Sequence, residues 1–380
     1  MTVLFWASAI ALFYSLFGYG MLLLALSRLR PRRTPPAGPG DPPNVSFLVA
    51  AYNEAPVIAD KVENTLALNT GGADIELIVV SDGSADETAE IVRKVDDPRI
   101  TVLEPGRVGK AQALAQGLKC CTGDIVVFSD ANAILEKNSL TAMLRHYADP
   151  EVGGVCGQIT VEGKSGGIGF AESLFWRYDQ QLKHAESRLG GAISAQGSVY
   201  SLRRALVRPP APGFTDDFVI FVGAVAQFHC LVFEPDASTV ENVTENVGNE
   251  MRRRIRSSER GWRSLLQNAG LMNPLRHGWY AWQLFSHKLM RRLNPFFLIL
   301  LFVSNLALMG QNLFYLATGL FQIAFYGVAA AGLVWPHLRR NKLVALPAFF
   351  TFAHIALLIG ILRCLFGRQS VLWTPSRDAG

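Results

Sequence analysis

Polar residues follow four short apolar runs of this sequence, at the points where each run ends. The runs are Val45–Ala51, Ile75–Ser81, Ile100–Leu103 and Ile125–Ser129, and the polar groups that follow them are Tyr52-Asn53-Glu54, Asp82-Gly83-Ser84, Gly109-Lys110 and Asp130-Ala131-Asn132. Asx-turns and helix N-caps would explain any one of these groups alone. Four run ends that offer carboxylates, amides and a lysine together indicate a binding site.

The segments between the apolar runs have the pattern of helices. They are Ala55–Leu68, Ala85–Lys94 and Lys110–Lys119. Short apolar strands that alternate with helices predict an α/β domain whose mainly parallel sheet is covered on both faces. In such sheets ligands bind beyond the carboxyl ends of the strands, which is where the polar groups lie. The sequence has no GxGxxG after the first strand and no GxxxxGK[ST], which argues against a dinucleotide cofactor and a P-loop NTPase.

A second acidic group, Thr215-Asp216-Asp217, lies farther along the chain. Adjacent carboxylates repel one another, so we expect a raised pKa for one of the two. A carboxylate with a raised pKa suits general-base catalysis, whereas a pair of acidic residues also suits a helix N-terminus. Position alone leaves both interpretations open.

The composition indicates a membrane protein. Hydrophobic residues make up 50% of the 380 residues and charged residues 18%, with a net charge of +5. The basic residues lie beside apolar runs, which favours a membrane surface as partner over nucleic acid. The five cysteines show no CxxC pair and no metal-ligand spacing, so we expect reduced thiols that face the cytosol.

Several apolar runs reach the roughly 20 residues that a membrane span needs. Val3–Leu26 is followed by Arg28 and further arginines, an order that argues against a signal peptide and places the N-terminus outside the cell. The run from 294 to 335 is long enough for two spans with a break at 310–312, and Leu343–Leu362 is a further candidate. Three spans would leave the C-terminus outside, whereas the arginines that follow favour the inside, so the two indications conflict.

The chain therefore divides into six segments. We expect an N-terminal transmembrane helix at 1–27, a basic Pro/Gly-rich linker at 28–43, a cytosolic domain at 44–273, an amphipathic interfacial helix at 274–293, about three transmembrane helices at 294–362 and a tail at 363–380. The interfacial interpretation of 274–293 depends on its mixture of aromatic and basic residues.

The ordered motifs resemble the membrane-bound inverting family 2 glycosyltransferases. The stretches are VSFLVAAYNE, IELIVVSDGSADET, GKAQALAQGL, IVVFSDAN, GSVYSLRR and FTDDF, and the likeness extends from about Val45 to Trp262. That family includes hyaluronan, chitin, cellulose and poly-N-acetylglucosamine synthases and ceramide glucosyltransferase-like enzymes. The resemblance implies the GT-A fold, a UDP-sugar donor and a location in the inner membrane with the catalytic domain in the cytoplasm.

The resemblance also implies roles for the donor-side residues. Asn53, Glu54 and Asp82 would surround the base and ribose, and Lys110 would lie against the nucleotide. Asp130 and Asn132 match the DxD motif, which holds the diphosphate through Mg²⁺ or Mn²⁺. Asn132 replaces the second carboxylate of that motif with a neutral amide, a poorer metal ligand. His229 is a possible further ligand, although a structural role suits it better.

On the acceptor side, the resemblance makes Asp217 the general base, with Asp216 as the second choice. Polymerising members carry a QxxRW motif, and the aligned stretch here runs from Arg253 to Ser257, so that only Arg256 keeps its residue type. We expect Arg253 and Arg256 to contact the donor diphosphate. The lost tryptophan leaves two acceptors open, a growing β-linked polysaccharide and a membrane lipid. A non-catalytic nucleotide-sugar-binding membrane protein is the least favoured alternative.

Overall fold

The computed structural model describes residues 1–30, 42–162, 167–195, 197–209, 211–242 and 247–367. Most of the predicted linker at 28–43 and most of the tail, including Arg368 and Arg377, lie outside the described residues.

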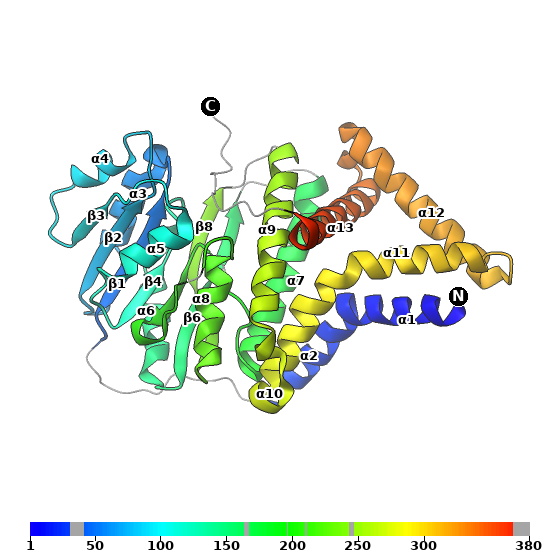
Figure 1. The fold of residues 1–380 in the computed structure, drawn as a ribbon, viewed down its shortest axis with the longest axis horizontal. Helices are drawn as coiled ribbons and strands as arrows, with labels where there is room; N and C mark the ends of the chain where they lie inside the picture. Colours follow the sequence, from blue (N-terminus) through cyan, green and yellow to red (C-terminus); the bar gives the residue numbers. More distant parts are fainter. Residues whose placement is uncertain (31–41, 163–166, 196, 210, 243–246, 368–380) are drawn as a thin grey trace.

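An eight-stranded sheet forms the centre of the first half of the fold (Figure 1). Its strands lie in the order β3 (Ile100–Leu103), β2 (Ile75–Ser81), β1 (Val45–Ala51), β4 (Ile125–Phe128), β7 (Tyr200–Arg203), β6 (Val152–Glu162), β8 (Cys230–Asn242) and β5 (Ile134–Leu135). The four predicted strands coincide with β1 to β4, apart from Ser129, which follows β4.

The sheet is mainly parallel, as the sequence predicts. β1 pairs in parallel with β2 and β4, β2 pairs in parallel with β3, and β6 with β8. All seven residues of β1 are buried, as expected for a strand covered on both faces. β7 runs antiparallel between β4 and β6, so the sheet changes direction beside the end of β4, where Asp130 lies.

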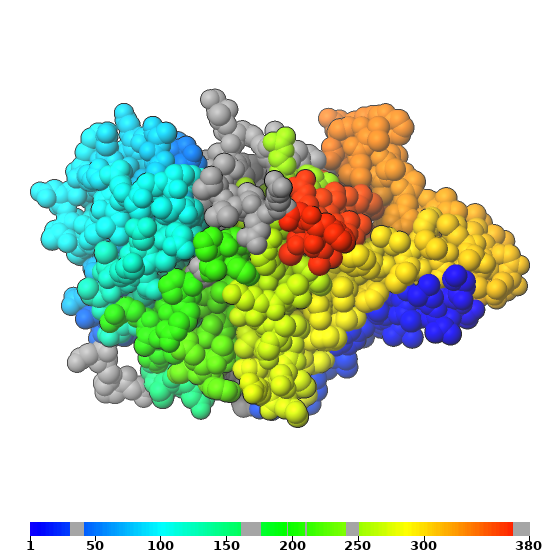
Figure 2. Space-filling view, in the orientation of Figure 1, coloured from blue at the N-terminus to red at the C-terminus, as the bar shows by residue number. Residues whose placement is uncertain are grey.

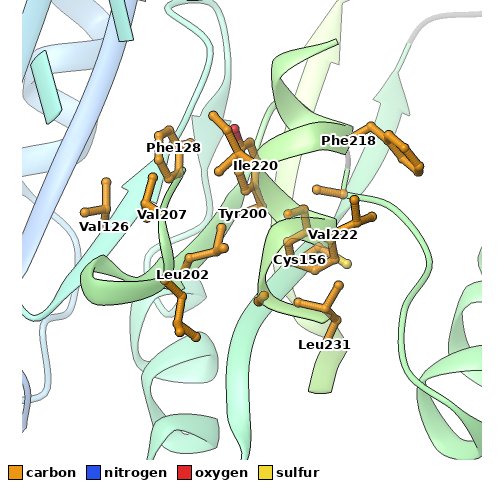
Figure 3. Close-up of a cluster of buried hydrophobic side chains, with 14 of the residues drawn as sticks. Val126, Phe128, Cys156, Tyr200, Leu202, Val207, Phe218, Ile220, Val222 and Leu231 are labelled. Atoms are coloured by element: carbon orange, nitrogen blue, oxygen red, sulfur yellow. The ribbon is translucent and has the colours of Figure 1, made fainter. Parts of the chain in front are cut away.

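Helices cover both faces of the sheet. The first face carries α3 (Ala55–Leu66), α4 (Thr88–Arg93) and α6 (Ser139–Leu144), whereas the second carries α5 (Lys110–Leu118) and α8 (Asp216–Ala226), with α9 (Val247–Gln267) packed beside α8. Figure 3 shows the apolar core of the second face, where Phe128 and Tyr200 stack with their ring centroids 4.8 Å apart. This core fixes α8, and with it Asp216 and Asp217, against β4 and β7.

Among the described residues, four helical segments are long and apolar enough to cross a membrane: Thr2–Arg28, Pro274–Leu308, Leu313–Val334 and Lys342–Phe366. The first comprises α1 (Thr2–Phe13), η1 (Tyr14–Gly18) and α2 (Tyr19–Arg28), and the second α10 (Pro274–Gln283), η5 (Leu284–Met290) and α11 (Arg291–Leu308); the last two are α12 and α13. α1 packs along α11, and Figure 1 shows both running away from the sheet. The break between α11 and α12 falls at 309–312, as predicted.

The predicted interfacial helix at 274–293 and the start of the span predicted after it belong to one continuous helical segment. The helix continues from Pro274 to Leu308, with a kink at Gly278, because α10, η5 and α11 follow one another directly. Part of this segment also packs inside the protein: the Trp282 indole Nε1 donates to the Tyr14 hydroxyl at 2.9 Å. Trp282 therefore binds the first apolar helix, whereas Trp279 is exposed.

The C-terminal helix α13 packs against the sheet domain as well as against α12. It contacts α9 and α7 (Gly167–Leu189), and the Ser258 hydroxyl of α9 donates to the Leu357 carbonyl at 3.0 Å. Figure 2 shows this helix, in red, at the junction between the sheet domain and the apolar helices. Its position ties the fourth candidate span to a helix of the candidate site.

Candidate functional site

The loops that follow β1 and β2 are joined by the side chains predicted to bind a nucleotide. Asn53 has a φ of 52°, in the left-handed region that asparagine tolerates better than most residues. Its side-chain oxygen accepts from the Ala85 backbone N–H at 2.8 Å, and its own backbone N–H donates to Ser84 Oγ at 3.1 Å. The next residue, Glu54, is buried, and its backbone N–H donates to Thr88 Oγ1. Asn53 and Glu54 are thus fixed at one edge of the sheet.

Asp82, at the end of β2, organises the loop that precedes α5. One carboxylate oxygen accepts from the Val108 and Gly109 backbone N–H groups, both at 2.8 Å, and the other pairs with the Arg107 guanidinium. Asp82 is fully buried, and the guanidinium of Arg107 lies 3.4 Å from the centroid of the Tyr52 ring. The stacked Arg107 and Tyr52 cover Asp82, so a nucleotide base would meet this pair before the carboxylate.

Lys110 connects the turn that follows β4 to the start of α8. Its ammonium nitrogen lies 2.8 Å from Asp130 Oδ1 and 2.9 Å from Asp216 Oδ2. Burial alone would lower the pKa of Lys110, but the two carboxylates outweigh it and raise the pKa above its ordinary value. In the structure a positive charge therefore stands between Asp130 and Asp216.

Asp217 differs from its neighbour Asp216, although both begin α8. Asp216 pairs with Lys110, whereas Asp217 Oδ1 accepts from the backbone N–H of Phe218 at 2.8 Å. Burial and the charge of Asp216 raise the pKa of Asp217 to about 6, against the opposing effect of Lys110. The predicted raised pKa of one carboxylate is confirmed, and it belongs to the residue preferred as the base.

A pocket opens beside Lys110 and Asp216. Its lining comes from the start of α5, from the loop before α8 and from α9: Val108, Gly109, Lys110, Ala111, Gln112, Pro212, Gly213, Phe214, Asp216 and Arg260. Burial lowers the pKa of Arg260, while Asp216 acts in the opposite direction. The loop is held to α9 because Ser264 Oγ accepts from the Thr215 backbone N–H at 3.0 Å and bonds the Thr215 hydroxyl at 2.8 Å.

The Asp130–Asn132 turn is fixed from behind by a buried lysine. Lys61 of α3 is 1% exposed and donates to Ser129 Oγ and to the Ala133 carbonyl, both at 2.7 Å. Ser129 Oγ in turn donates to the Ser198 carbonyl at 2.7 Å, which joins the end of β4 to the turn before β7. Burial lowers the pKa of Lys61 to about 7, and Asp130 opposes that shift.

The oxygen atoms of this turn suit a hard divalent cation but offer it few ligands. Asp130 is half-buried and Asn132 is exposed, so both are accessible. Among the described residues no group of three or more His, Cys, Asp or Glu side chains could hold a metal ion together. Asp130 is already neutralised by an ammonium group, that of Lys110. A cation here would therefore rest on Asp130 and Asn132 and take its other ligands from the substrate.

Of the predicted site residues, Lys110 and Asp216 line the pocket; Asp217 follows Asp216 in the chain but does not line the pocket, and neither do Arg253, Arg256 and His229. Arg253 is exposed and Arg256 is half-buried, and neither lines the pocket, which takes Arg260 from the same helix. His229 follows the far end of α8, where its ring Nδ1 lies 2.9 Å from the Gln227 carbonyl. An 11-residue helix spans about 16 Å, so His229 serves that end of α8 and not the metal.

Sequence reasoning missed Arg107, Lys61 and Arg260. Arg260 lies four residues after Arg256, one turn along the same helix face, and this spacing could have identified it. Arg107 and Lys61 carry no comparable signal, because a lysine on a helix and an arginine in a glycine-containing loop are ordinarily solvated.

Comparisons with known proteins identify related sequences and a related fold. Residues 46–207 match the family model described as glycosyl transferase family 2. Two relatives are poly-beta-1,6-N-acetyl-D-glucosamine synthases: that of Staphylococcus aureus (strain COL) is 28% identical over 233 residues, and that of Staphylococcus epidermidis is 27% identical. Each alignment covers 59% of this chain and 56% of the relative, so the match spans just over half the length of these relatives.

One solved structure resembles nearly the whole chain. It is a mannosyltransferase from Pyrobaculum calidifontis in complex with GDP-Man and Mn²⁺, with a TM-score of 0.71 over 96% of this chain and 99% of that one. The sequence identity is 22%, so the likeness establishes the fold. It shows that the chain has the GT-A fold.

Proposed function

We propose, from the premise that residues 46–207 form a glycosyltransferase family 2 domain, that this chain is a membrane glycosyltransferase. It transfers a sugar from a nucleoside diphosphate sugar to an acceptor hydroxyl. The observation that carries the proposal is the pair of unequal carboxylates at the start of α8: Asp216 is neutralised by Lys110, whereas Asp217 keeps a pKa of about 6 beside the pocket. Two carboxylates whose environments differ in this way suit catalysis at neutral pH, because the one with the raised pKa can act as a general base.

Asp217 takes the proton from the acceptor hydroxyl. The hydroxyl oxygen forms a bond to the anomeric carbon as the bond from that carbon to the diphosphate oxygen breaks. The electron pair of that broken bond leaves with the nucleoside diphosphate, and the proton ends on the Asp217 carboxylate. One displacement without a covalent intermediate inverts the anomeric configuration, which is consistent with a single base on the acceptor side.

Positive charge stabilises the departing diphosphate. Lys110 and Arg260 line the pocket and supply charge-assisted hydrogen bonds to phosphate oxygens. A divalent cation, Mg²⁺ or Mn²⁺, would be held by Asp130 and Asn132 and would neutralise charge on the leaving group. Lys110 keeps Asp216 oriented at the start of α8.

The nucleotide lies against the ends of β1 and β2. Tyr52 and Arg107 form a stacked pair whose outer surface suits a base, and Asn53 with Glu54 lies beside it. We propose UDP as the nucleotide on the strength of the motifs in this region. The solved mannosyltransferase holds GDP-Man, so GDP-sugars belong in the same test.

The acceptor is proposed to be a growing β-linked polysaccharide, as the names of the Staphylococcus relatives suggest. The second candidate is a lipid-linked acceptor. It is favoured by the position of the QxxRW counterpart, where Ser257 is an exposed serine, while nearby Trp262 is buried and offers no stacking surface. Four apolar segments would hold either acceptor next to the membrane.

A donor panel tests this proposal. The purified full-length chain in lipid nanodiscs is incubated with UDP- and GDP-sugars and Mn²⁺, with nucleotide release and product mass as readouts. We expect release of one nucleoside diphosphate above all others, and a product with inverted anomeric configuration by NMR. No turnover with any donor, under conditions where nucleotide binds, would show a binding protein and not an enzyme.

A further inference from the structure

The charged residues at the junction between α7, η5 and α11 do not balance. Two carboxylates, Asp179 and Glu186, project from α7. The basic groups around them are His287 with four fixed cations: Lys183, Lys288, Arg291 and Arg292. Counting the Lys and Arg side chains alone, four cations stand against two carboxylates at this junction.

The two carboxylates are already committed to part of this set. His287 Nδ1 lies 2.6 Å from Glu186 Oε1, and its Nε2 lies 3.2 Å from Asp179 Oδ1. Asp179 also lies 3.4 Å from Arg291 and 3.7 Å from Lys183. Asp179 is therefore paired with two cations, whereas the Glu186 carboxylate is hydrogen-bonded to His287 and to the Tyr19 hydroxyl.

Lys288 and Arg292 are the cations without such a partner. In the part of the chain that the structure describes, neither forms an ion pair, and the Arg292 guanidinium donates only to the Lys288 carbonyl, at 3.1 Å. They lie four residues apart on one helix, both half-buried, and they interact electrostatically with one another. Like charges at this spacing destabilise a helix, so the pair requires an anion to be favourable.

These two cations face the interior of the protein and not the lipid. Lys288 acts electrostatically on the Cys156 thiol, which is buried in β6. Arg292 lies against α9 where Gly261 has no side chain: a Cβ atom built there would come within 2.7 Å of Arg292 Nη2. The residue before that glycine is Arg260, which lines the catalytic pocket beside Asp216.

Cys156 of β6, on which Lys288 acts electrostatically, belongs to the same part of the sheet as Tyr200. It pairs with Tyr200 of β7, and Tyr200 interacts electrostatically with Asp217 and Asp130. Figure 3 shows Cys156 and Tyr200 in one core beneath α8. Arg292 thus lies beside α9, the helix whose Arg260 lines the pocket.

We propose that Lys288 and Arg292 bind the phosphate of a lipid-linked acceptor. This proposal rests on the proposed function and selects the second of its two acceptors: a saccharide joined to a lipid through phosphate, whose hydroxyl reaches Asp217 while its phosphate stays at the membrane junction. Since Asp217 removes a proton from a hydroxyl, the phosphate is not the nucleophile, and its bonds are unchanged by the transfer. The two positive charges of Lys288 and Arg292 match the two negative charges of a phosphate monoester or a diphosphate diester.

Binding of farnesyl phosphate and of its neutral isostere farnesol tests this assignment without any turnover. The full-length chain is placed in phosphatidylcholine nanodiscs, and binding is measured by isothermal titration calorimetry. We expect farnesyl phosphate to bind at least about tenfold more tightly than farnesol, because hydrogen bonds to a charged group are stronger than those to a neutral hydroxyl. Equal binding of the two probes would overturn the proposal.

Variants locate the binding. Lys288→Gln and Arg292→Gln should each weaken farnesyl phosphate binding by about 10- to 100-fold. Gly261→Ala should weaken it less, since the new methyl group displaces only the flexible end of Arg292. The matched control is Arg339→Gln with Arg340→Gln, two basic residues of η6 (Pro336–Arg340) outside the junction, which should bind as the wild type does. An unchanged affinity in both glutamine variants, with folding verified by thermal unfolding, would remove the site.

Two further arms separate the acceptor from other phosphate sources. Phosphatidylglycerol is added to the nanodiscs in one arm, and inorganic phosphate is added in the other. If either one binds as tightly as farnesyl phosphate, the site is a general headgroup or anion site, and the acceptor assignment is overturned. Asp217→Asn should bind farnesyl phosphate normally. If the wild-type chain bound the probe yet never transferred sugar, the proposed function would fail while this site would stand.

Discussion

At the scale of single residues, the difference between Asp216 and Asp217 determines how the rate should depend on pH. The raised pKa of Asp217, about 6, means that the carboxyl group is protonated and inactive as a base below that pH. We expect kcat/KM to fall about tenfold per pH unit below pH 6 and to level off above it. A profile of kcat/KM from pH 4.5 to 8 checks this, and a flat profile would assign the base elsewhere.

The amide at Asn132 leads to a second expectation at this scale. Asn132 is exposed and stands where a carboxylate would bind a divalent cation better, so Asn132→Asp should retain activity and lower the Mn²⁺ concentration needed for half-maximal rate. A Mn²⁺ titration of transfer by both proteins measures this effect. Full wild-type activity in excess chelator would contradict the metal requirement.

At the scale of elements, Lys61 of α3 supports the loop that carries Asp130. Lys61→Met keeps the volume but removes both hydrogen bonds, so the ends of β4 and of the turn before β7 lose their common anchor. We expect the KM for the donor to rise about tenfold or more, with little change in the melting temperature because a buried charge is removed as well. Asp60→Asn, an exposed change on the same helix, is the control. An unchanged KM for the donor in Lys61→Met would show that the loop carrying Asp130 keeps its position without Lys61.

The sequence predicts elements of this fold better than it predicts the site's supporting contacts. The strands β1 to β4 and the helices between them follow from apolar runs and polar ends, so Asn53, Asp82 and Asp130 were assigned to one edge of the sheet. β7 was not predicted, because four residues between a turn and a 3₁₀ helix carry no clear periodicity. Arg260 enters the pocket through the packing of α9, which no local pattern shows.

In the membrane segments, too, the sequence predicts the elements but not their long-range contacts. Length and hydropathy predicted four apolar segments and the break near 310–312, both of which the structure has. The interfacial interpretation of 274–293 missed that Trp282 and His287 have partners inside the protein. Those partners lie more than 100 residues away in sequence, and a local mixture of aromatic and basic residues does not reveal them.

At the scale of the whole molecule, α13 couples the apolar helices to the site through α9. Gly360 of α13 faces Ser258 so closely that a Cβ atom there would lie 2.5 Å from the Ser258 Cβ. Gly360→Leu should push α13 from α9, displace Arg260 and reduce kcat by up to about 10²-fold. Gly327→Leu, in α12 with no atom within 4 Å of its Cβ position, is the matched control and should transfer sugar normally. Equal rates in both variants would show that α13 does not act on the site.

The central claim is that Asp217 performs the chemistry while the rest of the site binds the donor. The direct measurement compares donor affinity and transfer rate in Asp217→Asn, Asp216→Asn and wild-type chains in nanodiscs, with the donor identified by the panel. We expect Asp217→Asn to bind the donor as tightly as the wild type and to transfer sugar about 10²–10⁴-fold more slowly, with a smaller loss in Asp216→Asn. Wild-type transfer by Asp217→Asn would contradict the account.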